Sequence, residues 1–329
     1  MRIVTAAHRV DVHHHILPGE YVSALARIGI TGGGGIPFPS WSVDDALGLM
    51  DRHGIQAAVT SISSPGVHFG DAAAARDLAR RCNEISARLV SDHPTRFGGF
   101  ATLPLPDVDG ALRELENALD TLRLDGVVLL ASQHDGRVLG DPAFDELFTE
   151  LDRRHAVVFV HPTIPKSSET IPIDVPGFAA EFTFDTSRAI LNLIWSGTAE
   201  RCRNVRLIFS HAGGTAPFLA WRWSLLDFLP GTLERAPHGV MHCLKSFFYD
   251  VALSANPNAL RSLCELVPPT QILFGTDFPF APEPVTRLTI DGLTRYDGFD
   301  EAARGAIERD NVLSVLGRLR DRLEGGGHA

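Results

Sequence analysis

Cysteine is scarce in this chain of 329 residues, and the four cysteines lie far apart without forming a CxxC pair (Cys82, Cys202, Cys243 and Cys264). This spacing argues against a disulfide scaffold and predicts buried, reduced thiols in a cytoplasmic protein. The sequence also lacks an apolar run long enough to cross a membrane. Because no long apolar region precedes the first expected strand at residue 9, we expect no signal peptide.

Basic residues are also fewer than acidic residues in this chain. Lysine and arginine number 30 against 40 aspartate and glutamate residues, which gives a formal net charge of −10. No basic run exceeds three residues, so a nucleic-acid surface is not expected. The glycine run at 32–35 is not followed by Gly-Lys-Ser/Thr, and no dinucleotide fingerprint follows the first strand. The first absence excludes a phosphate loop, and the second favours a barrel over an open doubly wound sheet.

Short β-branched runs alternate with longer helical patterns along the whole chain. Eight strands are expected, at 9–14, 57–62, 97–103, 126–131, 156–161, 205–211, 247–251 and 271–277. Helices are expected at 42–53, 71–92, 107–122, 141–155, 185–197, 215–228, 256–266 and 300–323. Several of these helices begin at Ser, Asp, Asn or Thr, which cap free backbone N–H groups. Eight alternations predict one (β/α)8 TIM barrel domain over residues 1–329, with an open doubly wound sheet as the alternative.

Two irregular segments interrupt this repeat, at about 18–41 and at about 166–181. The first carries the glycine run followed by Pro37-Phe38-Pro39, and the second carries Pro172 and Pro176. Both follow the carboxyl end of an expected strand, which is the face where barrel enzymes place their active sites. Long loops at that face often act as lids, although plain surface insertions remain the alternative.

His13 and His15 stand one residue apart at the end of the first expected strand. Alternate side chains of a strand point to the same face, so the two imidazoles can converge on one point while His14 points to the other face. Two histidines on one rigid strand are good ligands for zinc or a similar metal. The alternative is a surface histidine tract that binds no metal.

Further candidate ligands recur at the same relative place on three other strands. His161 ends the fifth expected strand, His211 the sixth and Asp277 the eighth. In a closed barrel these carboxyl ends ring one mouth, together with His13 and His15. Such recurrence predicts a metal site rather than a set of unrelated loop residues.

The motifs DVHHHILP, VHPT, FSHAGG and LFGTDFPF resemble the metal-dependent amidohydrolase superfamily, and in particular the branch that contains aminocarboxymuconate-semialdehyde decarboxylase. The segment that begins Asp185-Thr186-Ser187 is also similar to that branch. The resemblance runs from about Val10 to about Asn311, nearly the whole chain. The resemblance is specific for the fold and the metal site but not for the substrate, because the branch covers several aromatic acid decarboxylases, a hydratase and some lactonases.

The resemblance implies a ligand set and a catalytic residue. It assigns metal ligation to His13, His15, His161 and Asp277, and a role beside metal-bound water to His211. The fourth expected strand carries no lysine, so a carbamylated-lysine bridge between two metals is not expected. One divalent ion is therefore expected, and zinc suits a mixed His/Asp set, although manganese tolerates it too.

The resemblance also implies a homodimer, in which Arg222 reaches the carboxylate of a substrate in the neighbouring active site. The alternative for Arg222 is a surface salt bridge. The second arginine of the decarboxylase is not evident in the first insertion, which favours a flat, apolar aromatic acid over a dicarboxylate. Phe38, Trp41 and Phe280 are candidate walls for that acid, or else lid packing, and His68 is a further candidate pocket residue.

The function expected from these features is metal-dependent, non-oxidative decarboxylation of a small aromatic or conjugated carboxylic acid of the salicylate type. The ring carbon must be protonated before carbon dioxide leaves, and Asp277 or His211 would relay that proton. Asp277 as a pure ligand is the competing interpretation. The same ligands could instead serve a hydrolase acting on a lactone or amide, and a non-catalytic metal-binding scaffold is a third hypothesis.

Overall fold

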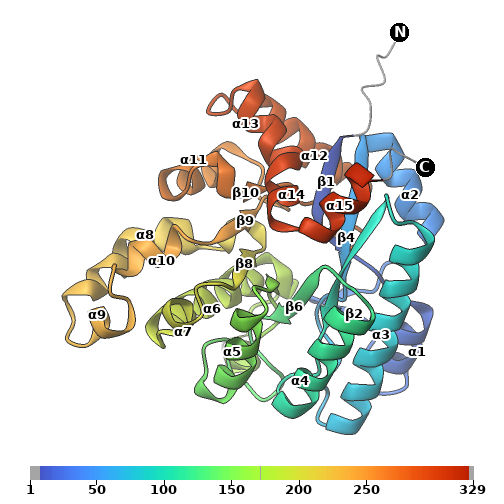
Figure 1. Cartoon of the computed structure of the whole chain (residues 1–329), viewed down its shortest axis with the longest axis horizontal. Helices are drawn as coiled ribbons and strands as arrows, with labels where there is room; N and C mark the ends of the chain where they lie inside the picture. Colours follow the sequence, from blue (N-terminus) through green and yellow to red (C-terminus); the bar gives the residue numbers. More distant parts are fainter. Residues whose placement is uncertain (1–7, 171, 326–329) are drawn as a thin grey trace.

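Eight parallel strands follow one another around a nearly closed barrel in the computed structural model, which describes residues 8–170 and 172–325 (Figure 1). Their spatial order is the order of the chain: β1 Arg9–His15, β4 Ile55–Ser61, β5 Phe97–Thr102, β6 Gly126–Leu130, β7 Val157–His161, β8 Arg206–Phe209, β9 Phe248–Asp250 and β10 Ile272–Leu273. The residues that follow β10 bring the chain back to β1, where the Val12 amide donates to the Phe274 carbonyl over 2.9 Å. The predicted TIM barrel and its eight strands are confirmed.

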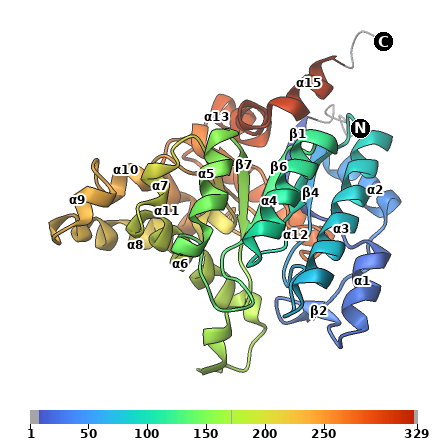
Figure 2. The same ribbon diagram turned by 60° about the horizontal axis from the view of Figure 1, so that its bottom comes forward.

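Helices surround the barrel; α1–α11 lie between strands in the chain, and α12–α15 follow the last strand (Figure 2). They are α1 Gly19–Ala26, α2 Val43–His53, α3 Ala72–Asp92, α4 Val108–Glu116, α5 Asp145–Arg153, α6 Glu181–Trp195, α7 Thr198–Arg201, α8 Ala216–Ser224, α9 Thr232–Arg235, α10 Val240–Leu244, α11 Pro257–Leu266, α12 Glu283–Arg295, α13 Glu301–Gly305, α14 Asn311–Val315 and α15 Gly317–Gly325. The expected starts at Ser42, Asp71 and Asn256 are confirmed, because each side chain accepts a backbone N–H of the first turn.

The expected helix at 185–197 was placed too late in the chain. In the structure α6 begins at Glu181, and Asp185 lies inside the helix, where its carboxylate accepts the Thr163 amide over 2.9 Å. The expected helix at 300–323 is divided into α13, a π-helical turn, α14 and α15. The sequence analysis also missed α1 and α12, of which α1 lies within the first insertion.

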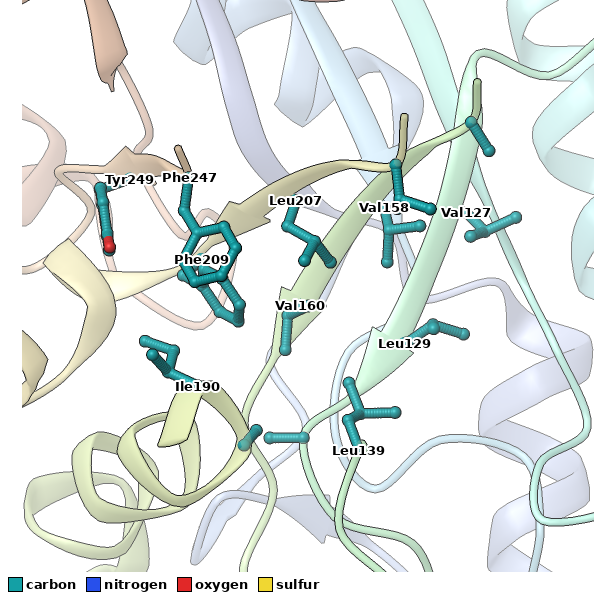
Figure 3. Packing of buried hydrophobic residues seen from close by; sticks show 14 of the residues in the cluster. Val127, Leu129, Leu139, Val158, Val160, Ile190, Leu207, Phe209, Phe247 and Tyr249 are labelled. Carbon is teal, nitrogen blue, oxygen red and sulfur yellow. The ribbon is translucent and has the colours of Figure 1, made fainter. Parts of the chain in front are cut away.

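The apolar core has two layers that follow the alternation of side chains along the strands. Val158, Val160 and Phe209 face outward and pack with Ile190 of α6 between the sheet and its helices (Figure 3). Val157 and Phe159 belong to the inner layer, which α14 and α15 cover at the amino-terminal end of the barrel. Because His161 continues the inner series 157, 159, 161, its imidazole points into the barrel mouth.

The two insertions have little regular structure of their own. The first holds α1 and a small antiparallel hairpin, β2 Gly32–Gly33 paired with β3 Ile36–Pro37. The second holds two 3-10 turns, Lys166–Thr170 and Gly177–Ala179, and its residue 171 lies outside the described residues. The four cysteines are free thiols. Among the described residues, no helix has both the length and the apolar character that a membrane crossing requires.

Candidate metal centre

Four side chains meet at the carboxyl ends of the strands, inside the barrel mouth. His13 and His15 come from β1, His161 ends β7, and Asp277 follows β10. One potential ligand atom of each lies within 4.8 Å of the others, and all four residues are buried. The structure therefore brings the predicted ligand set together.

Contacts on the far side of each imidazole fix which nitrogen faces the centre. The Nδ1 atoms contact the Asp250 carboxylate for His13 (2.8 Å), the Ser61 hydroxyl for His15 (2.9 Å) and the Pro162 carbonyl for His161 (2.8 Å). A carboxylate or a carbonyl can only accept, so Nδ1 carries the proton in His13 and His161. In the neutral ring this leaves Nε2 with a free lone pair, which is the form a metal ligand needs.

The spacing of the ligand atoms fits a divalent ion. The Nε2 atoms of His13 and His15 lie 3.0 Å apart, and Asp277 Oδ1 lies 3.3 and 3.1 Å from them. Zinc–nitrogen bonds of about 2.0–2.1 Å place tetrahedral ligands roughly 3.3 Å apart. His161 Nε2 is buried and has no hydrogen-bond partner among the described residues. Leaving a buried polar atom unpaired costs about 1–3 kcal/mol, a cost that metal binding at this atom removes.

Burial and neighbouring charges shift the pKa values of the four candidate ligands in different directions. Burial opposes a charge on His13, yet the carboxylates of Asp250 and Asp277 raise its pKa to about 10. Burial lowers the pKa of His15 to about 4, and it holds the pKa of His161 well below the usual value, helped by the neighbouring histidines. Burial would raise the pKa of Asp277, but His13 and His15 hold it well below the usual range. Asp277 is therefore an anion at neutral pH.

A tight crossing between the residues after β10 and β1 places Asp277. The Asp277 amide donates to the His13 carbonyl over 2.8 Å, and Asp277 takes a left-handed φ of +63°. A Cβ atom at Gly275 would lie 2.8 Å from the Cβ of His13, so this position needs glycine. The motif Phe-Gly-Thr-Asp thus supplies both the candidate ligand and the glycine that this close approach to β1 needs.

His211 lies beside the centre rather than within the four-ligand group. Its ring centroid is 4.9 Å from that of His13 and 5.7 Å from that of His161. Nδ1 donates to the Ala252 carbonyl over 3.2 Å, and the buried Nε2 has no partner among the described residues. Burial, followed by the charge of His13, lowers the pKa of His211. The imidazole is therefore neutral and has a free Nε2 lone pair.

A cavity of about 180 Å³ lies directly over the centre, and His161 and Asp277 are part of its wall. Its other walls are mostly apolar: Gly33, Gly34, Ile36, Ser63, Ser64, Phe178, Phe182, Leu253, Phe280, Ala281, Pro282 and Val285. The ring of Phe280 lies edge to face with that of His15, with 5.6 Å between the ring centroids, and Phe182 lies in the same way against His161 at 5.7 Å. Two aromatic rings therefore flank the ligand cluster, and no lysine or arginine lines the cavity among the described residues.

The two insertions meet each other above this cavity. The Phe178 amide donates to the Gly34 carbonyl over 2.9 Å. Gly34 has a φ of +63°, and a Cβ atom there would lie 2.9 Å from the Phe182 ring. At Gly35, with a φ of +86°, a Cβ atom would lie 2.6 Å from the Gly177 nitrogen. The glycine run thus lets the hairpin pack closely against the second insertion as a roof.

Of the other residues predicted for the site, only Phe280 lines this cavity. Phe38 lies behind Phe280, at 6.5 Å between ring centroids, and Trp41 packs against the core. His68 lines a smaller, separate cavity with Gln133 and His134. Arg222 is exposed on α8 and makes no ion pair among the described residues, so the salt-bridge alternative is not what the structure shows.

The sequence analysis missed several residues that the structure places around the centre. Asp250 ends β9 at the same level as the ligands, and its strand-end position was the signal that could have found it. Phe182, Ser63 and Leu253 line the cavity from segments outside the motifs. They gave no signal because their contacts with the site are set by the packing of loops far apart in the sequence.

Comparisons with known proteins agree with this architecture. Residues 10–318 match the sequence model of the amidohydrolase family. A 6-methylsalicylic acid decarboxylase from Penicillium expansum is 35% identical over 320 residues, which are 96% of this chain and 98% of that protein. The crystal structure of an amidohydrolase II superposes with a TM-score of 0.86 at 29% identity, covering 94% of this chain and 99% of the other.

A second crystal structure of the same fold, at 23% identity and a TM-score of 0.79, is a dihydroxybenzoic acid decarboxylase from Polaromonas sp.. It contains manganese and the inhibitor 2-nitroresorcinol, and the superposition covers 94% of this chain and 96% of that protein.

Proposed function

Because this chain belongs to the amidohydrolase family, we propose that it is a metal-dependent carboxy-lyase that decarboxylates a salicylate-type aromatic acid without an oxidant. The observation that carries this proposal is the four-ligand cluster at the floor of an apolar cavity with aromatic walls. Such a cavity suits a flat ring, and the cluster suits the oxygens of a carboxylate and a neighbouring hydroxyl. The 6-methylsalicylic acid decarboxylase, similar along the whole chain, supports this substrate class.

His13, His15, His161 and Asp277 would hold one divalent ion. When bound, the ion supplies positive charge that fixes the substrate oxygens and lowers the pKa of a bound water. We propose zinc, because imidazole and carboxylate ligands at this spacing suit it. The manganese in the Polaromonas enzyme of similar fold makes manganese the alternative.

The remaining chemistry is the movement of a proton to the ring carbon that bears the carboxyl group. Asp277 stays ionised between two imidazoles, so we assign it to ligation and to holding negative charge near the substrate. Since Nδ1 of His211 is occupied by the Ala252 carbonyl, its free Nε2 would first accept a proton from water or from the acidic substrate and then pass that proton to the ring carbon. Phe182 and Phe280 would keep the ring over the ligand cluster and exclude water.

We further propose a homodimer formed through α8 and the residues that follow it. Figure 1 shows α8 and α9 projecting from the barrel. Phe218, Trp221 and Phe228 on this projection are 83%, 75% and 85% exposed, an apolar surface typical of a protein interface. Arg222 lies among them, where it could reach a carboxylate in the partner's cavity. We also propose a cytoplasmic location, which rests on the four free thiols.

The test combines metal analysis with a substrate panel. We expect one divalent ion per chain and release of carbon dioxide from a hydroxybenzoate, with activity lost to a chelator and restored by the metal. His161→Ala should lose the ion, whereas the exposed His134→Ala should keep it. Alkali uptake with lactones or amides, and no carbon dioxide from any acid, would establish a hydrolase instead. A chain without metal, and indifferent to chelators, would refute the site.

A further inference from the structure

Asp250 occupies the position where the metal cluster and His211 meet. Its Oδ2 accepts the Nδ1–H of His13 over 2.8 Å. Its Oδ1 accepts the backbone amide of His211 over 3.0 Å and that of Ala252 over 2.9 Å. Asp250 is fully buried, so water does not compete for these oxygens. One carboxylate therefore contacts both a ligand histidine and the backbone of the proton-transfer histidine.

The contact with His13 determines which nitrogen of that ring can bind a metal. A carboxylate has no proton to donate, so the imidazole must carry its proton on Nδ1 and leave Nε2 free. The neighbouring His15 is less constrained, because the Ser61 hydroxyl can either donate or accept. Within the described residues, Asp250 is thus the one side-chain anion whose contact with the distal nitrogen holds a ligand of the cluster in its metal-binding tautomer.

The other carboxylate oxygen stabilises an unusual backbone. His211 and Ala212 have left-handed φ values of +54° and +56°, and Leu253 on the adjoining turn has a φ of +55°. A left-handed backbone is strained for residues other than glycine. The two amide hydrogen bonds to Oδ1 hold this turn, and the Ala252 carbonyl in turn accepts Nδ1 of His211. The same carboxylate therefore sets where both imidazoles stand.

The cluster of His13, His211 and Asp250 could also be taken for a second metal site, since their potential ligand atoms lie within 4.8 Å of one another. Asp250 already accepts three N–H groups at 2.8–3.0 Å, which occupies three of the four lone-pair sites of its carboxylate. The His13 nitrogen nearest to Asp250 carries a proton. These contacts favour an orienting role over ligation.

We propose that Asp250 is a positioning residue, which fixes the metal-binding tautomer of His13 and the placement of His211 relative to it. The inference rests on the proposed metal site. Buried partners of this kind typically change metal affinity or activity by about 10–100-fold when they are removed. Asp250 would contribute both to metal binding and to proton transfer without touching the substrate.

Asp250→Asn is the sharpest test because the two side chains have nearly the same shape. An amide has one oxygen for the three N–H groups that the carboxylate serves. We expect that oxygen to face the two backbone amides, so that the NH₂ group faces His13 and drives it to the tautomer with a proton on Nε2. Metal affinity, measured by competition with a chelator of known affinity, should then fall by about 10–100-fold. The kcat of the variant at saturating metal should also fall.

Asp11→Asn is the matched control. Asp11 is equally buried on β1. Its Oδ1 accepts the backbone amides of His13 and Thr276 over 3.0 Å, and the oxygen of an asparagine can keep both bonds. Its Oδ2 contacts the Thr276 hydroxyl and Nδ1 of His14, which is not a ligand. His14 Nε2 has no partner among the described residues, so His14 can change tautomer without affecting the centre. Asp11→Asn should lose stability while its metal affinity stays within about threefold of the wild type.

A second measurement uses the wild-type chain and does not depend on a variant that folds. Nitrogen-15 histidine spectra of the zinc-loaded protein should show His13 with its proton on Nδ1, in slow exchange with water. A His13 proton on Nε2, or wild-type metal affinity in a folded Asp250→Asn variant, would overturn the proposal. Failure of the wild type to bind metal would instead refute the proposed function itself.

Discussion

Asp185 should make the protein less stable at neutral pH than it is in weak acid. Its carboxylate is fully buried, accepts the Thr163 amide over 2.9 Å, and leaves Oδ1 without a partner among the described residues. Burial raises the pKa of this carboxyl from 3.8 to about 6. A carboxyl that holds its proton more tightly in the folded state favours folding below pH 4. That contribution is lost as the pH rises through about 6.

The size of the effect follows from the shift. A difference of about two pKa units, at 1.36 kcal/mol for each, gives an upper bound of about 3 kcal/mol at neutral pH. Asp185→Asn removes the charge and keeps an oxygen for the Thr163 amide. Its NH₂ group then lacks a partner, which lowers the stability of the folded variant by about 1 kcal/mol. We therefore expect the variant to be more stable than the wild type by about 1–2 kcal/mol at pH 8, and less stable by about 1 kcal/mol at about pH 4.

Urea unfolding of both proteins across this pH range measures the difference. Asp125→Asn is the matched control, because the buried carboxylate of Asp125 is paired with Arg322 at 2.9 Å and with the Gly99 amide. That variant should be less stable than the wild type at pH 8. An Asp185→Asn variant that is less stable than the wild type at pH 8, or a stability gain that does not change with pH, would refute the reasoning.

Three further predictions concern the site and its surroundings. His211→Ala should lower kcat by about 10²–10⁴ while one metal ion stays bound; loss of the metal would make His211 a ligand, and near-full activity would remove it from the proton path. Arg222→Lys should raise KM without changing the unfolding midpoint, since lysine cannot form two parallel hydrogen bonds with a carboxylate. A monomer in light scattering, or unchanged KM, would contradict that role. Gly34→Ala should raise KM because its new Cβ meets the Phe182 ring, whereas Gly136→Ala, with the same left-handed strain and open space around it, should lose stability only.

The barrel could be predicted from the sequence because its signal is local and repeated. Each strand is a short β-branched run, and the caps at Ser42, Asp71 and Asn256 use only residues of the following turn. The strand ends were less accurate. β8 ends at Phe209 rather than at 211, and β10 at Leu273 rather than at 277. Beyond these ends the backbone is left-handed at His211 and at Asp277. Those turns aim the two side chains and cannot be read from residue type.

The ligand cluster could be predicted, whereas the cavity above it could not. Histidines and an aspartate at strand ends stand out, and the barrel geometry brings them together. The roof depends on a contact between Gly34 and Phe178, which lie on different insertions. Gly34 belongs to the conspicuous glycine run, but nothing in the sequence pairs that run with Phe178, and Phe38 and Trp41 are the more conspicuous aromatic residues of the first insertion. Their side chains pack behind the cavity wall instead.

Asp250 and Asp185 show where residue type alone stops being informative. Both are buried aspartates near the cavity, and both belong to segments that read as apolar with an occasional acid. Asp250 accepts three N–H groups within 3.0 Å, so its charge is balanced by donors and can orient other groups. The Asp185 carboxylate accepts the Thr163 amide over 2.9 Å and has only weaker contacts with Ser132. The Thr163 hydroxyl contacts Ser64 in the cavity wall over 2.9 Å. The number of donors around each carboxylate therefore predicts opposite effects of the same Asp→Asn change: weaker metal binding at position 250 and greater stability at position 185.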